Sequence, residues 1–168
     1  MEVKKVAKKV AVSGVLIALA FIFSYVEVLI PFQLGIPGVK LGLANIVSLV
    51  ALYLLDEKMA ATITVVRVIL TGFTFGSLYS MLYSMAGALL SLAFMIGAKR
   101  WNKFTMIGVS VLGGVMHNAG QLIMAAVVLK TVPFFYYTPV LILSGIVTGI
   151  MIGFLGKGIR ERLVKLEA

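Results

Sequence analysis

The feature that most constrains this chain is a series of long apolar runs separated by short breaks of charge, proline or glycine. A run of about 20 apolar residues is long enough to cross the hydrocarbon core of a bilayer as one helix. The breaks place six candidate helices at about 10–30, 40–55, 59–75, 77–98, 105–129 and 138–156. With 61% apolar residues and a mean hydropathy of +1.12, the chain has the composition of an integral membrane protein. We therefore predict an all-α integral membrane protein in which residues 1–168 form one bundle of six transmembrane helices.

Two of these boundaries affect the predicted topology. The first apolar run continues to Ile30, which is too long for the apolar part of a cleaved signal peptide, so we expect an uncleaved first helix. The break between the third and fourth helices, from Thr71 to Gly76, is only a short turn that contains glycine. Without that break the chain would have five spans, and its termini would lie on opposite sides of the membrane.

The distribution of basic residues supports six spans. Six spans put both termini on one side, and that side then collects twelve basic residues: Lys4, Lys5, Lys8, Lys9, Lys58, Lys99, Arg100, Lys103, Lys157, Arg160, Arg162 and Lys165. The other side holds only Lys40 and Lys130. Because cytoplasmic loops carry the excess of lysine and arginine, we predict cytoplasmic termini in a multi-pass protein of the cell membrane. The net charge of +9 is thus attributed to topology and the lipid bilayer, and no nucleic acid partner is expected.

Several catalytic chemistries lack the residues that they require. The chain has no cysteine and a single histidine, which argues against thiolate chemistry and against a zinc site. Its one aspartate, Asp56, cannot form the clustered aspartates that hold magnesium in a prenyl diphosphate synthase. No Walker A loop and no Ser-His-Asp arrangement is evident. We predict a protein that is not an enzyme and needs no cofactor, so that any active transport takes its energy from a partner.

Polar residues within the apolar runs are the candidates for function, because they are costly in hydrocarbon unless each has a partner. Depths estimated along the predicted helices place them together in the outer half of the bundle. The seven are Glu27, Lys40, Asn45, Arg67, His117, Asn118 and Gln121.

Two interpretations of this cluster remain open. In one, Glu27 and Arg67 form a structural ion pair, and the residues on the fifth helix form a hydrogen-bonded clamp between helices. In the other, Arg67 and Lys40 contact an anionic or carbonyl-bearing ligand, and His117 with Gln121 four residues later presents a polar face to it. Glu27 is then a counter-ion or a contact to an N–H group of the ligand.

The sequences of the two longest outer loops and of the sixth helix predict further structural features. Residues 31–39 contain two prolines and two glycines and predict an irregular, lid-like outer loop. Residues 131–139 are aromatic, which is typical of an interfacial belt or of a cap over a ligand cavity. Gly145, Gly149 and Gly153 recur every fourth residue and predict close helix packing, for which we favour a neighbour within the bundle. Beyond the sixth span, residues 159–166 predict a short interfacial helix.

Small residues also recur near the start of the first helix. Ala7 with Ala11, and Gly14 with Ala18, are spaced by four and give this helix a smooth face. We predict that this face contacts another membrane protein.

Several sequence strings resemble those of one known family. They are Pro-Gly-Val-Lys-Leu-Gly-Leu-Ala-Asn at 37–45, Arg67, Phe-Gly-Ser at 75–77, Ser84 with Gly87 and Ser91, and His-Asn-Ala-Gly-Gln at 117–121. In these strings, and along nearly its whole length, the chain resembles the Gx transporter family. That family is also labelled heptaprenyl diphosphate synthase component I and is related to the S components of energy-coupling factor (ECF) transporters.

The resemblance implies a six-helix S component that captures a small molecule from outside. Such a subunit docks on a membrane coupling subunit that is driven by two cytoplasmic ATPases, often through an Ala-xxx-Ala patch that Ala7 and Ala11 match in form. An S component of an ECF-type importer is therefore the leading prediction. The alternatives are a non-catalytic membrane partner in prenyl diphosphate or quinone metabolism or in flavin-based electron transfer, and a structural scaffold.

Overall fold

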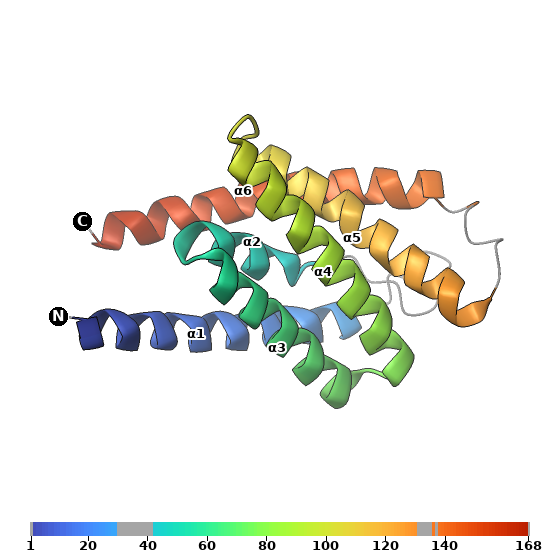
Figure 1. The fold of residues 1–168 in the computed structure, drawn as a ribbon, viewed down its shortest axis with the longest axis horizontal. Helices are drawn as coiled ribbons and strands as arrows, with labels where there is room; N and C mark the ends of the chain where they lie inside the picture. The colour runs from blue at the N-terminus through green and yellow to red at the C-terminus, as the bar shows by residue number, and fades with distance from the viewer. Residues whose placement is uncertain (1, 30–41, 131–135, 137, 168) are drawn as a thin grey trace.

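The structure, a computed structural model, describes residues 2–29, 42–130, 136 and 138–167. This part of the chain is helical and contains no strand (Figure 1). Its helices are α1 (Glu2–Leu29), α2 (Asn45–Leu54), α3 (Glu57–Phe75), α4 (Leu78–Trp101), α5 (Met106–Leu129) and α6 (Thr138–Glu167). All of these except α2 are long and apolar enough to cross a membrane. The prediction of an all-α membrane bundle with six helices is confirmed, and so is the break between the third and fourth helices.

Short polar caps explain how so few residues separate consecutive helices. The Ser77 hydroxyl accepts a hydrogen bond from the Ser80 amide at the start of α4, and the Thr105 hydroxyl accepts one from the Gly108 amide at the start of α5. Each cap satisfies an amide that has no acceptor within its own helix. At the end of α4, Asn102 adopts a left-handed conformation with φ of 56°, which turns the chain.

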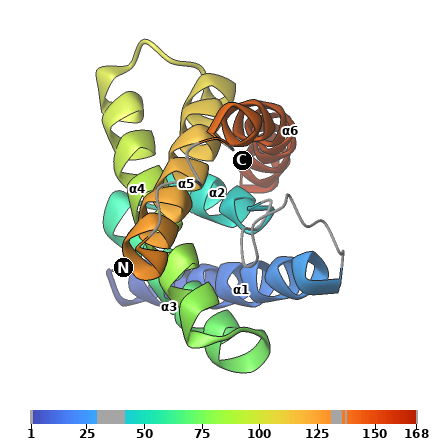
Figure 2. The same cartoon turned by 90° about the vertical axis from the view of Figure 1, so that its right-hand side faces the viewer.

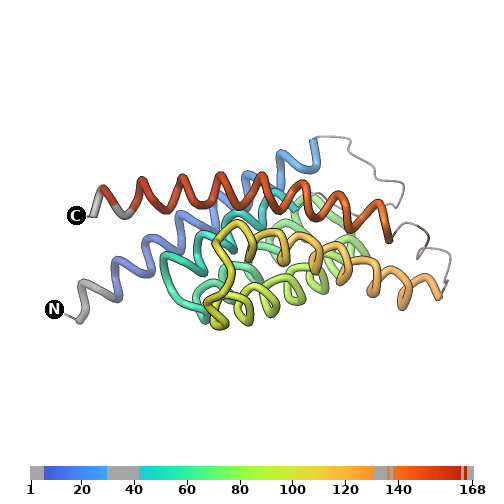
Figure 3. The backbone as a smooth tube through the Cα atoms, turned by 90° about the horizontal axis from the view of Figure 1, so that it is seen from above, coloured from blue at the N-terminus to red at the C-terminus, as the bar shows by residue number. Residues whose placement is uncertain are grey.

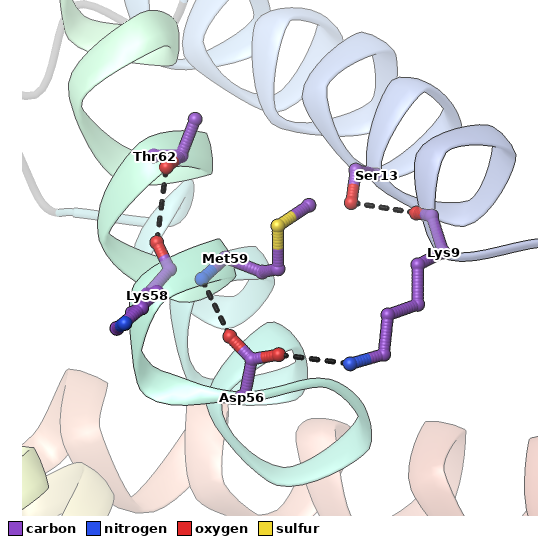
Figure 4. Close-up of polar contacts among 6 residues, drawn as sticks. All are labelled: Lys9, Ser13, Asp56, Lys58, Met59 and Thr62. Atoms are coloured by element: carbon purple, nitrogen blue, oxygen red, sulfur yellow. Dashed lines mark hydrogen bonds and ion pairs between the residues drawn. The ribbon is translucent and has the colours of Figure 1, made fainter. Parts of the chain in front are cut away.

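Asp56 caps α3 and also joins it to α1. Its carboxylate accepts a hydrogen bond from the Met59 amide at 2.9 Å and lies 3.1 Å from the ammonium of Lys9 (Figure 4). The Met59 amide and the Lys9 ammonium together lower the pKa of the Asp56 carboxyl below its ordinary value. The α2–α3 turn is thus held to the first helix by a charged contact.

The two ends of the chain lie at the same end of the bundle. The start of α1, the end of α6 and the α2–α3 turn are all on the left in Figure 1, and the tube in Figure 3 shows the same arrangement. The α4–α5 turn lies toward this end as well. These four segments carry the basic residues predicted for one side, so we call this the basic end. Its cytoplasmic orientation stays a prediction.

Helix α2 differs from its prediction as a full span over 40–55. It has ten residues, which at about 1.5 Å per residue is roughly half the thickness of a hydrocarbon core. Residues 45–52 are all buried, and α2 packs against α1, α3 and α6 (Figure 2). Hydropathy predicted a span because α2 is apolar all round, but the chain reaches Asn45 through a turn in which Gly42 has φ of +80°.

Helix α6 packs closely on α5 through its glycines. A Cβ added to Gly149 would lie 2.6 Å from the Cα of Val111, and one added to Gly145 would lie 2.9 Å from the backbone of Gly114. Gly153 meets Ile107 in the same way. Real side chains do not approach so closely, so these positions require glycine. The prediction that the stripe packs within the bundle is confirmed.

Helices α1 and α6 are longer than the spans predicted for them. Helix α6 runs without interruption to Glu167, so the separate interfacial helix expected near 159–166 was wrong. Gly156 lies within this helix and packs against Leu49 and Met106, where a Cβ would lie 3.0 Å from Leu49. Helix α1 likewise begins at Glu2 rather than near residue 10. Hydropathy locates the part of a helix that suits hydrocarbon, and it does not locate where the helix ends.

Two of the predicted loops fall mainly outside the described residues. The lid-like loop at 31–39 lies outside them, and of the four aromatic residues at 134–137 only Tyr136 is described, at 89% exposure.

The close α5–α6 contact predicts a penalty for the smallest possible side chain. We expect Gly149→Ala to lower the free energy of unfolding by about 1–3 kcal/mol, because the two backbones must move apart. Gly97→Ala in α4 is the matched control, since nothing lies within 4 Å of a Cβ there, and it should be neutral or slightly stabilising. Thermal unfolding in detergent, followed by circular dichroism, measures both. Equal stability of the two variants would contradict this account of the glycine stripe.

Candidate functional site

Glu27 joins the end of α1 to the turn before α2. Its carboxylate accepts hydrogen bonds from the backbone amides of Gly42 and Leu43, the second at 2.9 Å. The Asn45 amide then donates to the Gly42 carbonyl at 2.8 Å, and α2 begins. A carboxylate at this position also interacts favourably with the positive end of the α2 dipole.

Arg67 is buried in α3 and reaches the first residue of α2. Its side chain is 6% exposed, and Nη2 donates to the Asn45 side-chain oxygen at 3.2 Å. Its Nε is buried and has no hydrogen-bond partner among the described residues. Electrostatic attraction from Glu27 also acts on the guanidinium. A buried guanidinium with an unused N–H can donate a further hydrogen bond to an anionic or carbonyl group.

His117 approaches the same place from α5, and two glycines give it room. A Cβ on Gly42 would lie 3.4 Å from Cδ2 of the imidazole, and a Cβ on Gly87 in α4 would lie 2.8 Å from the His117 carbonyl oxygen. A side chain at Gly87 would push α5 away, whereas a Cβ at Gly42 would make an ordinary contact with the imidazole. The imidazole is 4% exposed, so it belongs to the interior of the bundle.

A small polar cavity lies where these side chains meet. It measures about 10 Å³, which is about the space that one water molecule needs. It is lined by Ser24, Glu27, Gly42, Arg67, Val68, Thr71, Ser84 and His117. We call this the central cavity. Its lining comes from α1, α3, α4, α5 and the turn before α2, so it is the point where most of the bundle converges.

Gln121 lies one turn beyond His117 on α5 and packs against Gly87. A Cβ on Gly87 would lie 2.8 Å from Cγ of Gln121. The side chain is fully buried, and neither of its amide atoms has a hydrogen-bond partner among the residues that the structure describes. A buried carboxamide without partners costs roughly 1–3 kcal/mol.

Asn118 faces a different neighbour. Its Nδ2 donates to the Leu141 carbonyl at 2.7 Å and, more weakly, to the Ser144 hydroxyl at 3.4 Å, both on α6. Asn118 is thus a clamp between α5 and α6. Consecutive residues of a helix point in different directions, so Asn118 faces α6 while His117 faces the interior of the bundle. The predicted convergence of the three polar residues of α5 on one ligand therefore does not extend to Asn118.

The predicted site residues therefore fall into three groups. Glu27, Arg67 and His117 line the central cavity, Asn45 binds Arg67 beside it, and Gln121 lies next to His117. Asn118 contacts α6, and Lys40 lies outside the described residues.

Sequence reasoning missed several residues that line the central cavity. Ser24 precedes Glu27 by three residues, and Thr71 follows Arg67 by four, so each shares a helix face with a predicted residue. The Thr71 hydroxyl in fact donates to the Arg67 carbonyl at 2.9 Å. Helical spacing around each charged residue could have found both hydroxyls.

The small residues predicted to contact another protein lie on an accessible face of α1. Ala7, Ala11, Gly14 and Ala18 are all exposed, and a Cβ on Gly14 would meet nothing within 4 Å. Their role in docking stays a prediction. In the described part of the chain, no group of three or more histidine, cysteine, aspartate or glutamate residues could hold a metal ion.

Comparison with known proteins places the chain in a family. The sequence profile of the family described as heptaprenyl diphosphate synthase component I matches residues 16–159, a region that begins in α1 and ends in α6. The chain belongs to this family. No curated protein and no solved structure matches the chain. The match confirms the resemblance to the Gx transporter family, and together with the five long apolar helices it establishes a multi-pass membrane protein.

In this family member, the unsatisfied Gln121 predicts an unusual gain of stability. We expect Gln121→Leu to leave the free energy of unfolding unchanged or to raise it by about 1–3 kcal/mol, because the buried carboxamide is removed and its volume kept. Gln121→Ala, which also removes the amide but leaves a void, should be less stable than Gln121→Leu. Thermal unfolding of the three proteins in detergent measures the order. A loss of stability in Gln121→Leu as large as that in Gln121→Ala would contradict it.

Removal of the Asn118 side chain is expected to lower the free energy of unfolding, unlike removal of the Gln121 carboxamide. We expect Asn118→Leu to lower the free energy of unfolding by about 1–2 kcal/mol, the range found for hydrogen bonds between membrane helices in model peptides. Ser144→Ala, which removes only the longer contact, should change it less. The same unfolding measurement tests both variants, and unchanged stability of Asn118→Leu would rule out a clamp.

Proposed function

We propose that this protein is the substrate-binding subunit, or S component, of an ECF-type importer. In this role it captures a small vitamin-like or precursor molecule from the outer side of the membrane. One observation carries the proposal: charged and polar side chains from four helices converge on the central cavity, beside the turn before α2. This convergence lies in the half of the bundle away from the basic end, which is the outer half if the positive-inside prediction holds.

The chemistry of the central cavity favours recognition of a polar molecule. Arg67 offers a cationic donor, Glu27 an acceptor, and Ser24, Thr71 and Ser84 offer hydroxyls that both donate and accept. Ligand sites usually combine a few such groups with apolar walls. An anionic or carbonyl group on the substrate would suit Arg67 and its unused Nε. A substrate N–H group would suit Glu27.

The size of the central cavity implies that the substrate enters by rearrangement. A cavity of about 10 Å³ holds a water molecule, whereas ligand pockets measure roughly 300–1,000 Å³. Asn45 and the turn amides occupy polar groups of Arg67 and Glu27 in the arrangement described above. Substrate would replace the Arg67–Asn45 contact and the contacts of Glu27 with the turn.

Import by an S component needs partners that supply energy. We propose a membrane coupling subunit and two cytoplasmic ATPases, as in related ECF complexes. The exposed face of α1 that includes Ala7, Ala11, Gly14 and Ala18 is our candidate for the surface that meets the coupling subunit, because small side chains allow close approach.

The family description supports a second candidate. The family is named for a component of heptaprenyl diphosphate synthase. A non-catalytic membrane partner in prenyl diphosphate or quinone metabolism would explain that name, and a partner in flavin-based electron transfer is the related alternative. A lipid-like molecule bound between helices, in place of a polar molecule in the central cavity, would favour this candidate.

The leading proposal is tested by native mass spectrometry of the protein purified from its own host. We expect a small polar molecule bound to the wild type, with affinity weakened at least tenfold by Arg67→Gln, since a charge-assisted hydrogen bond contributes roughly 1.5–3 kcal/mol. Asn118→Leu is the matched control, because it removes a buried polar residue of α5 that faces α6 and should retain the ligand.

Two outcomes count against the proposal. One is that the wild type carries no small molecule and co-purifies with no ATPase. The other is that Arg67→Gln, shown to be folded by its circular dichroism spectrum, retains the molecule as well as the wild type does.

A further inference from the structure

A second and larger cleft lies at the basic end, away from the central cavity. It measures about 520 Å³, which is the size of a ligand pocket, and its lining comes from α2, α4, α5 and α6. We call it the basic cleft. Its charged lining residues are Lys99, Lys157, Arg160 and Glu161. Three cations and one carboxylate give it an excess of positive charge.

The cations of the basic cleft converge on one aromatic ring. The ammonium of Lys99 lies 5.1 Å from the centre of the Tyr53 ring, and the guanidinium of Arg160 lies 5.7 Å from it. Lys99 and Arg160 come from α4 and α6, far apart in the sequence. The positive-inside rule requires basic residues in loops, but it does not require two of them to meet at one ring in a cleft.

The positive charge of the cleft is only partly compensated within the protein. Glu161 lies 3.9 Å from Lys157, an exposed pair of the kind that contributes little. Lys99 donates to the Leu52 carbonyl at 2.5 Å, at the end of α2. In the described part of the chain neither Lys99 nor Arg160 forms an ion pair with a carboxylate. An anion in the cleft would therefore meet the Arg160 guanidinium, which forms no ion pair in the described part of the chain.

The first turn of α5 borders the same cleft. Met106 and Ile107 are the first two residues of α5, and both line the cleft. The amides of a helix's first turn have no acceptor within the helix and carry its positive partial charge. Together with the cations, they suit an anion with several oxygens, such as phosphate.

Apolar and aromatic side chains beside the cleft indicate the level of the lipid headgroups. Trp101 and Phe104 pack edge to face at 5.8 Å, both are exposed, and Phe104 lines the cleft. Aromatic residues of this kind are enriched at membrane interfaces. On α6, Phe154 and Leu155 are also exposed, less than one turn before Lys157. The cleft thus lies between a charged surface and an apolar one.

We propose that the basic cleft binds a phosphate group, carried by an anionic phospholipid of the adjacent leaflet or by a soluble phosphate compound. Arg160 and Lys157 bind the phosphate oxygens, the Tyr53 ring holds Arg160 and Lys99 beside it, and exposed apolar residues of α6 accompany the acyl chains of a lipid. Basic pockets between transmembrane helices bind anionic headgroups by the same chemistry.

The test compares two double variants of the full chain in detergent, each of which removes two positive charges from α6. Lys157→Gln with Arg160→Gln alters the basic cleft, and Arg162→Gln with Lys165→Gln alters exposed positions that do not line it. Binding of phosphatidylglycerol and of phosphatidylcholine is measured by native mass spectrometry. Melting temperatures without added lipid check that both variants fold.

We expect the wild type to bind phosphatidylglycerol at least tenfold more tightly than phosphatidylcholine. The cleft variant should bind phosphatidylglycerol about 30-fold more weakly than the wild type, since each basic side chain near an anionic lipid contributes roughly a factor of five. The control variant should remain within about threefold of the wild type, because its charges act only through screened, longer-range attraction.

A separate arm distinguishes the two sources of phosphate. Displacement of phosphatidylglycerol by inorganic phosphate in molar excess would assign the cleft to a soluble phosphate compound, and retention of the lipid would assign it to a phospholipid. The proposal is overturned if the wild type binds neither phosphatidylglycerol in preference to phosphatidylcholine nor inorganic phosphate. It is also overturned if both double variants lose affinity equally, which would indicate a diffuse basic surface.

Discussion

The hydrogen bonds between the Glu27 carboxylate and the amides of Gly42 and Leu43 determine how the rest of the bundle can assemble. They fix the turn from which α2 enters the interior, and they bring Asn45 to Arg67. Because α2 is buried along residues 45–52, every helix that packs against it depends on where it begins. The same carboxylate lines the central cavity, so the contact that sets the fold also belongs to the proposed binding site.

Because the Glu27 carboxylate both holds the turn and lines the central cavity, the turn also affects Arg67. A guanidinium in hydrocarbon must have an anion or polar oxygens near it. Here Asn45 supplies the oxygen that accepts its hydrogen bond, and Glu27 supplies the negative charge. Both partners are held by the turn before α2. Any movement of that turn therefore alters the surroundings of the buried Arg67 guanidinium. A substrate whose oxygens replaced those of Asn45 and Glu27 would offset the loss of these contacts.

Much of the fold could be predicted from the sequence, because helices that cross a membrane must be both long and apolar. Hydropathy located all six helices, and the glycine spacing of α6 predicted its packing on α5. Hydropathy could not show that α2 is half a span, since Asn45–Leu54 is as apolar as a helix in lipid. It also missed the polar continuations of α1 and α6, where helix persists without hydrocarbon around it.

The candidate site was predicted less completely. Depth along each helix correctly brought Glu27, Asn45, Arg67 and His117 together, because charges avoid lipid and gather in the interior. The direction in which a side chain points depends on the rotation of its helix. That rotation is set by packing, and it turned Asn118 toward α6 while leaving Gln121 beside Gly87. The basic cleft escaped prediction for a similar reason, since its cations come from α4 and α6 and meet only in three dimensions.

The unbroken course of α6 has a mechanical meaning. A helix of 30 residues without an interruption behaves as a stiff rod about 45 Å long. Its glycine seam against α5 lies between Lys157 and Arg160 on one side and Leu141 and Ser144 on the other. A rod supported near its middle tilts as a lever, so a force applied to the charged segment of α6 would displace the segment that holds Asn118. The helix that carries His117 would receive that displacement through the Asn118 carboxamide as well as through the glycine seam.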